Sequence, residues 1–281
     1  MSNNIRNGGR AQSFSIQTSA PPAERVTDEP VTYKTAQSTV TCAYQTNIAG
    51  FWRNVTILWC KNIMNHSLSI TVDSLDVDVF WDLRSAKFSG GPEPSADYYV
   101  ALVSDEEVVL LLGDHKKKAY KRTKSRPALV DAIQFYKKEN VFAKKCFSTR
   151  AKFEEKKKEH DIVVESSTSG PRDPEMWISI DGIVLIHVKN LQWKFRGNQT
   201  VLVDKLQVQV FWDVHDWLFS NPGTGHGLFI FKPGAPEADS DRDGDSSRGG
   251  DSDTSTGSSR YYNARAAAPE FSLLLYAWKI D

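Results

Sequence analysis

One phrase of this sequence occurs twice, and the repetition constrains the fold more than any other feature. Residues 72–82 read VDSLDVDVFWD and residues 203–213 read VDKLQVQVFWD, with eight of eleven positions identical. A match of this length within one chain indicates an internal duplication. We therefore predict two related halves, each containing one copy of the phrase.

The repeated phrase has the alternation of a β-strand. Successive side chains of a strand point to opposite faces, so Val77, Val79 and Trp81 share one face and Asp82 lies on the other. The second copy repeats this arrangement. A face of two valines and a tryptophan is typical of a buried strand, and we predict that both copies are core strands.

Short alternating runs continue on both sides of the phrase. Asp181-Gly182 separates two apolar runs and is a strong hairpin signal, and 104–106 predicts a second hairpin. No helical pattern alternates with the strands, which excludes a parallel α/β sheet. We predict an all-β fold, an antiparallel β-sandwich or barrel-like fold with two internally related halves. The predicted strands are 39–45, 52–59, 66–72, 76–82, 97–104, 107–112, 128–136, 141–152, 160–166, 175–180, 183–193, 199–204, 206–213 and 226–231.

Two segments fall outside this pattern. Residues 1–38 are polar and without periodicity, and 237–269 consist largely of Asp, Ser and Gly. Neither segment can bury enough apolar surface to offset its ordering entropy. We predict a disordered N-terminal arm and a disordered acidic loop. The apolar run 271–280 follows that loop, so we expect the β-rich domain to comprise 39–236, with 270–281 returning as its final strand.

Composition narrows the compartment and the class of partner. Thirty-five basic and thirty-five acidic residues cancel, so no net charge draws the whole chain to nucleic acid or membrane. Three cysteines favour a reducing compartment over a disulfide framework. The N-terminus lacks the apolar core of a secretory signal, and no apolar run reaches membrane-helix length. We expect an intracellular protein of the cytoplasm or nucleus, with an organelle as the alternative.

The aspartates that follow the two FW pairs are the only candidates for catalysis that the repeat provides. Pseudo-symmetry could bring Asp82 and Asp213 together, and paired carboxylates perform acid–base chemistry. The competing interpretation is that each aspartate closes its strand by an Asx-type turn. No GxSxG, phosphate-binding loop or kinase signature accompanies the pair. We favour the structural interpretation.

A basic run in the connector at 115–126 is the main candidate for binding. It reads HKKKAYKRTKSR and contains no acid. Such a run can bind phosphate, nucleic acid or anionic lipid, or serve as a nuclear localisation signal. The alternatives are a solvated connector between hairpins, which we favour, and a contact with the acidic loop of the same chain. The candidate anion-binding residues are Lys116, Lys117, Lys118, Lys121, Arg122, Lys124 and Arg126.

The remaining chemistry-bearing residues form no motif. The six histidines are scattered without an HxH or HxxxH pair, and the cysteine spacing fits no zinc site. We therefore predict no metal and no cofactor. Eight tryptophans could supply a stacking platform for a small ligand, but burial in the core is the default explanation.

Several long phrases together resemble a family of plant proteins catalogued as domain of unknown function 868. The resemblance covers most of 39–236 and includes the final apolar run; it implies a plant source and carries over no catalytic residue. The phrases include FWRNVTILW (51–59), VDVFWDLRSAKFSGGPEP (77–94), YYVALVSDEEVVLLLGD (98–114), DPEMWISIDG (173–182), LQWKFRGNQTVLVD (191–204) and VQVFWDVHDWLF (208–219).

The first half departs from the family pattern in one place. In the second half, the segment LQWKFRGNQTVLVD leads into the repeated phrase. By resemblance, members of the family carry a similar segment, with Trp and Lys, before the first copy as well. Here SLSITVDS runs almost directly into LDVDVFWD. We predict that about one hairpin of β-structure is missing before residue 77, which would leave a neighbouring strand with an unpaired edge.

These observations favour a non-enzymatic binding or scaffold module. One alternative is a carrier that holds a small apolar or glycosidic ligand in a β-barrel or sandwich cavity. The other is an enzyme that uses the aspartate pair. The sequence names no partner, and the candidates for the basic 115–126 run are a protein and an anionic ligand.

Overall fold

The strands of the described residues form three sheets. The computed structural model describes residues 12–17, 38–63, 65–74, 76–143, 145–154, 157–167, 173–221, 224–234 and 270–279. The first half contains β1 (Gln12–Gln17), β2 (Ser38–Ile48), β3 (Phe51–Lys61), β4 (His66–Val72), β5 (Asp78–Asp82), β6 (Tyr99–Ser104), β7 (Glu107–Leu112), α1 (Lys116–Thr123) and β8 (Arg126–Pro127). The second half contains β9 (Ile133–Ala143), β10 (Cys146–Ala151), β11 (His160–Ser167), β12 (Glu175–Ile180), β13 (Ile183–Val188), β14 (Arg196–Val203), β15 (Leu206–Asp213), α2 (His215–Phe219), β16 (His226–Pro233) and β17 (Ser272–Lys279).

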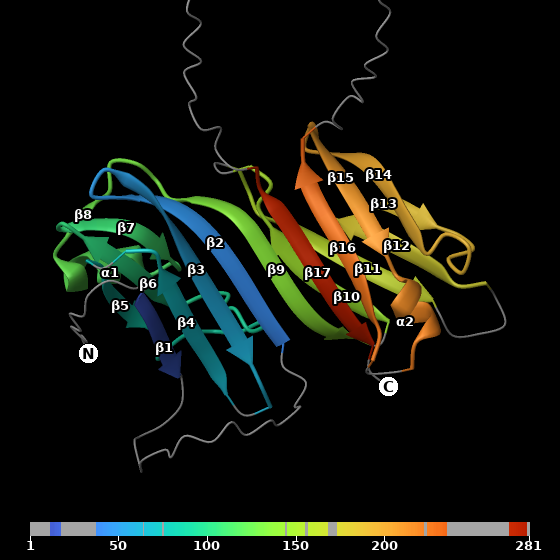
Figure 1. The fold of residues 1–281 in the computed structure, drawn as a ribbon, viewed down its shortest axis with the longest axis horizontal. Helices are drawn as coiled ribbons and strands as arrows, with labels where there is room; N and C mark the ends of the chain where they lie inside the picture. Colours follow the sequence, from blue (N-terminus) through green and yellow to red (C-terminus); the bar gives the residue numbers. More distant parts are fainter. Residues whose placement is uncertain are drawn as a thin grey trace, which may run out of the picture.

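One large sheet carries both halves. Its nine strands run in the order β1-β4-β3-β2-β9-β17-β16-β15-β14, and two four-stranded sheets have the orders β5-β6-β7-β8 and β10-β11-β12-β13. Figure 1 shows the large sheet extending across the molecule, with one small sheet at each end. One apolar core lies between β2–β4 and β5–β7, and another lies between β10–β13 and β14–β17. The fold is thus two β-sandwiches that share a sheet, which confirms the predicted all-β class.

The two sandwiches have the same strand plan. In the first, β5, β6 and β7 form an antiparallel ladder, and β8 adds to β7 in parallel. In the second, β15, β16 and β17 form the same ladder, and β9 adds to β17 in parallel. The copies of the repeated phrase therefore occupy equivalent positions. Their valines at 77, 79, 208 and 210 are buried, so the predicted core face is confirmed.

Both predicted hairpins are present, and the backbone explains their sequences. Asp181 and Gly182 have φ angles of 50° and 78°, and Asp105 and Glu106 have 50° and 59°. Two consecutive residues with positive φ are the signature of the type I′ turn, whose twist matches that of the strands it joins. Asp and Gly tolerate this conformation, which makes Asp181-Gly182 a readable signal.

Other local predictions were wrong. The basic run predicted as a connector forms the helix α1, which packs on β5–β7 through Ala119 and Tyr120. The ambiguous segment 128–136 becomes a strand only from Ile133 onward. The strand predicted over 141–152 is divided between β9, which ends at Ala143, and β10, which begins at Cys146.

The flanking segments are only partly described. Within the predicted N-terminal arm, 12–17 form β1 at the edge of the large sheet, next to β4. The apolar run near the end of the chain forms β17, between β9 and β16. Residues 237–269 lie outside the described residues, so the proposed boundaries of the domain and of the acidic loop stay a prediction.

Candidate functional site

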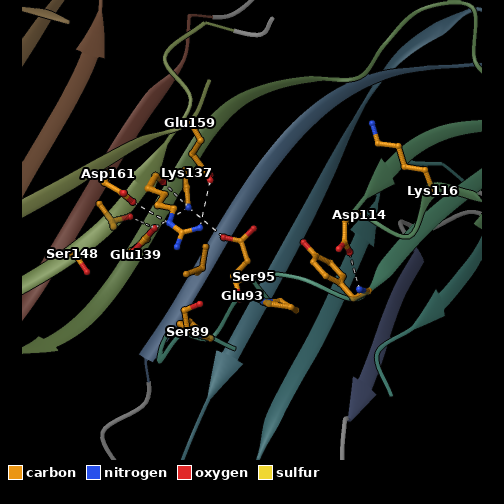
Figure 2. Close-up of a pocket in the computed structure, with 18 residues that line it drawn as sticks. Ser89, Glu93, Ser95, Asp114, Lys116, Lys137, Glu139, Ser148, Glu159 and Asp161 are labelled. Atoms are coloured by element: carbon orange, nitrogen blue, oxygen red, sulfur yellow. Dashed lines mark hydrogen bonds and ion pairs between the residues drawn. The ribbon is translucent and has the colours of Figure 1, made fainter. Parts of the chain in front are cut away.

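A cleft opens where the two sandwiches meet. Its cavity measures about 580 Å³ and lies over β2 and β9, between the 89–95 loop and Asp114 of the first half and β10–β11 of the second. We call this cavity the junction cleft; Figure 2 shows its lining side chains converging from both halves. They include Ser89, Glu93, Ser95, Tyr98, Asp114, Lys116, Lys137, Glu139, Ser148, Thr149, Arg150, Glu159 and Asp161.

A buried lysine lies at the floor of the junction cleft. The Lys137 side chain is 8% exposed, and its Nζ lies 3.1 Å from Glu139 Oε1 and 3.3 Å from Glu93 Oε2. The same ammonium donates a hydrogen bond to the carbonyl of Arg150 at 2.9 Å. Thr149 donates its hydroxyl to Glu139. Lys137 therefore ties a loop of the first sandwich to a strand of the second.

Burial and charge act in opposite directions on this lysine. Burial alone lowers a lysine pKa, whereas the carboxylates of Glu93 and Glu139 raise it, and the net result is a raised pKa for Lys137. Burial, and next the charge of Glu93, raises the pKa of Cys42 and of Tyr98. Both groups therefore stay protonated at neutral pH, which makes them poor nucleophiles.

A second set of paired charges lies on the β10–β11 side of the cleft. Arg150 Nε donates to Asp161 Oδ1 at 3.1 Å, and Arg150 Nη1 lies 4.0 Å from Glu159 Oε2. The positive charges of Lys137 and Arg150 are therefore neutralised within the protein, while five acidic and three basic residues leave the lining with a net charge of −2. A paired carboxylate still has lone pairs that can accept hydrogen bonds, and serine hydroxyls both donate and accept. The lining suits a polar ligand without a large net charge.

The aspartates of the repeated phrase are not brought together. Asp82 ends β5 and Asp213 ends β15, and Figure 1 shows these strands at opposite ends of the molecule. Each Oδ1 accepts the backbone N–H two residues later, as an Asx-type turn requires. Each carboxylate also pairs with an arginine, Arg84 or Arg196.

The arginine beside Asp82 also sets its protonation state. Hydrogen bonds from Arg84 lower the pKa of the Asp82 carboxyl from 3.8 to about 2. A general acid needs the reverse shift. The geometry therefore favours a structural role for both aspartates.

The seven basic candidates lie on or just after α1, and all are exposed. Arg126 pairs with Glu107 at 2.6 Å, and Lys118 contacts the His115 ring at 3.3 Å. For the other five, no ion pair forms with an acid among the described residues. Three lysines occupy the first turn of α1, where positive charge opposes the helix dipole. The helix therefore presents a surface that an anionic partner would stabilise.

One group of potential metal ligands lies beside the cleft. Oxygen and nitrogen atoms of Asp97, Asp114 and His115 lie within 4.8 Å of one another. Asp114 already accepts the backbone N–H groups of Asp97 and Tyr98, and Asp97 pairs with Lys87 at 2.7 Å. These protein contacts account for the carboxylates, and we assign no metal to the group.

Comparison with protein families identifies the chain's relatives. The model of the family described as "Plant protein of unknown function (DUF868)" matches residues 35–76 and 71–279. The chain belongs to this DUF868 family. No curated protein and no solved structure matches it. In the described part of the chain, no helix is long and apolar enough to cross a membrane.

The DUF868 match is divided at a structurally informative place. Its two segments meet at 71–76, between β4 and β5, where the sequence predicts missing residues. The equivalent strands of the second half, β12 and β15, are separated by β13 and β14. The divided match and the shortened connection both support a deletion of about two strands from the first half.

Sequence reasoning did not identify the junction cleft. The signal was present in β9, where Lys137 and Glu139 have the same parity as Val141 and Ala143. Charged residues at core-facing positions of a central strand indicate a polar site. The structure shows two exposed tryptophans, Trp52 and Trp193, and both lie outside the cleft.

Proposed function

We propose that this DUF868 protein is a non-enzymatic binding module, and that its junction cleft holds a small, hydroxyl-rich ligand of the glycoside class. The observation that carries the proposal is the internal pairing of the charges that line the cleft. Lys137 and Arg150 are already neutralised by carboxylates, so an anionic ligand would have to break ion pairs.

The polarity of the lining selects among ligand classes. An apolar ligand would cover carboxylates and serine hydroxyls without satisfying them, which costs free energy for each group. A saccharide offers donors and acceptors on every face. Its hydroxyls can donate to Glu93, Glu139 and Asp161 and can accept from Ser148. The Ser95 hydroxyl already donates to the carbonyl of Lys87, and it can still accept a hydrogen bond.

The absence of turnover is part of the proposal. Near the cleft, Cys42 and Tyr98 are held protonated by their raised pKa values. Ion pairs engage the two most buried charges, Lys137 and Glu139. Such groups bind and orient a ligand, and they do not supply a nucleophile and base in hydrogen-bond contact.

The experiment is a binding screen on the full chain. Saturation-transfer difference NMR against mono-, di- and oligosaccharides and aryl glycosides is expected to reveal bound ligands, which are recovered unchanged. Ser148 faces the cleft from β10 and is exposed, so Ser148→Trp fills the cavity and is expected to weaken binding at least tenfold. Thr200→Trp, on the exposed surface of β14, is the matched control.

The outcomes separate the parts of the proposal. If no glycoside binds, or if Ser148→Trp binds as well as wild type, the cleft is not the ligand site. If the bound ligand is converted, the non-enzymatic role is wrong.

A second candidate function is attachment to an anionic membrane surface through α1. Unpaired lysines supply electrostatic attraction of about 1 kcal/mol each, and the neighbouring Leu129 is 91% exposed and could insert among headgroups. Sedimentation with vesicles of phosphatidylcholine and phosphatidylserine tests this function. The double variant Lys117→Glu/Lys121→Glu is expected to stay in solution, and equal sedimentation of wild type and variant would exclude it.

Both candidate functions suit the expected location in the cytoplasm or nucleus. A fluorescent fusion expressed in plant cells tests this location, and import into an organelle would contradict it.

A further inference from the structure

The two sandwiches differ at one edge. In the second, β14 pairs with the full length of β15. In the first, β5 pairs with β6 on one side only, and it is the end strand of its sheet. Within the described ranges, the backbone of 78–82 makes no hydrogen bond on the other side. An unpaired edge of this kind is a template for an added strand.

The first missing position is filled from within the chain. β12 is followed in its sheet by antiparallel β13, and the equivalent strand β4 is followed by antiparallel β1. β1 therefore occupies the place of β13. In the described part of the chain, no strand occupies the place of β14 beside β5.

The tryptophans of the repeat show what the β5 edge lacks. Trp212 is 8% exposed, its Nε1 donates to the carbonyl of Lys194 at 3.1 Å, and it is paired in register with Gly197 of β14. A Cβ added to Gly197 would lie 2.3 Å from Trp212 Cζ2, so only glycine fits beneath the ring. The equivalent Trp81 is half-buried and has no such strand beside it.

Charge argues against a second copy as the partner. An antiparallel pair of β5 strands centred on Phe80 would place Asp78 opposite Asp82 of the other copy. Like charges directly opposite each other destabilise a ladder. Asp78 is exposed and forms no ion pair with a described residue. A neutral or basic strand fits this edge better.

We propose that the open edge of β5 binds an extended segment of a partner protein, added antiparallel, neutral or basic, with glycine opposite Trp81. β14 gives the register. In the second sandwich, Gly197 of β14 lies opposite Trp212, and Val201 lies opposite Val208. A partner strand in the same register, with glycine opposite Trp81, would therefore place a β-branched residue opposite Val77. The added strand would cover Trp81 and satisfy the free backbone groups of β5.

The test uses the full chain and a synthetic peptide with the β14 sequence, RGNQTVLV. Hydrogen exchange followed by mass spectrometry measures protection of residues 76–82. The peptide is expected to slow exchange there at least fivefold. Two control peptides are matched to it. One replaces glycine with isoleucine, which would clash with Trp81, and the other carries N-methyl groups on the amides that face β5. Both are expected to give no protection.

Each alternative result overturns the proposal. Before any peptide is added, protection of more amides in 76–82 than the pairing with β6 accounts for would mean that the chain itself covers the edge. Protection that rises with protein concentration alone would mean that a second copy is the partner. Changes in hydrogen exchange that are confined to β15 would mean that the peptide displaces β14 from its own place in the second sandwich. Equal protection by the isoleucine peptide would remove the requirement for glycine.

Discussion

The buried Lys137 gives the sharpest test of how the two sandwiches are joined. We expect Lys137→Met to fold and to lose about 3 kcal/mol of unfolding free energy at pH 7. Methionine keeps most of the length of the side chain and removes its charge. Glu139, whose side chain is 8% exposed, is then left without its cation.

The magnitude follows from the burial of the two carboxylates. Removing one member of a buried ion pair costs about 3–5 kcal/mol, because the other charge stays desolvated. Glu93 is 32% exposed and can turn toward water, so its contribution is small. Glu139 is buried and cannot turn toward water, although the Thr149 hydroxyl still donates a hydrogen bond to it. The expected loss therefore lies at the lower end of this range.

Urea unfolding, followed by far-ultraviolet circular dichroism, measures the loss. The double variant Lys137→Met/Glu139→Gln should recover about half of it, because the amide leaves no buried charge. Lys138→Met is the matched control on the opposite face of β9. Its ammonium lies over the Tyr276 ring at 4.5 Å, and its removal should cost about 1 kcal/mol or less. Equal stability of Lys137→Met and Lys138→Met would refute the reasoning.

Three further predictions concern other parts of the fold. Gly197→Ala should cost about 1–3 kcal/mol in urea unfolding, because its Cβ meets Trp212, whereas Gly91→Ala meets nothing within 4 Å and should cost less. Hydrogen bonds, of which the one from Lys158 has the largest effect, lower the pKa of Asp181 from 3.8 to about 2. The stabilisation of the folded protein by this carboxylate is therefore complete above pH 3.8 and is lost as the pH falls through 2. Asp181→Asn, which keeps the turn, should therefore cost about 1 kcal/mol at pH 7 after allowance for solvent screening, and less than half of that at pH 2. A cost that does not change with pH would contradict this. Trypsin should cut within 237–269 first, with the two fragments still associated on a sizing column.

Features that depend on local sequence were predictable. Strand parity predicted that the repeated valines lie in the core, where the structure places them. The dipeptide Asp181-Gly182 predicted a tight hairpin turn, and the positive φ angles of both residues are those of a type I′ turn. The short helix α1 was missed because its neighbours are strands and its few apolar residues gave no periodic stripe. Its lysine and alanine content was nevertheless favourable for a helix.

Features that join distant segments were not predictable in the same way. Glu93, Lys137 and Arg150 meet only because β9 is shared by both sandwiches. No spacing in the sequence specifies that contact. The parity of Lys137 and Glu139 could have indicated a polar patch, but not what lies opposite it. The pairing of β1 with β4 likewise depends on an edge whose usual neighbour is missing.

The position of β17 has a consequence for the order in which the protein can be made. β17 separates β9 from β16 in the large sheet, yet it follows both in the chain. Until Ser272–Lys279 have left the ribosome, the large sheet is divided into two parts with open edges, β1–β4 with β9 and β14–β16. While the long 235–269 segment is translated, the nascent chain therefore exposes the edges of β9 and β16, where wrong strand pairing can occur. Chaperone binding during synthesis should be strongest in that interval.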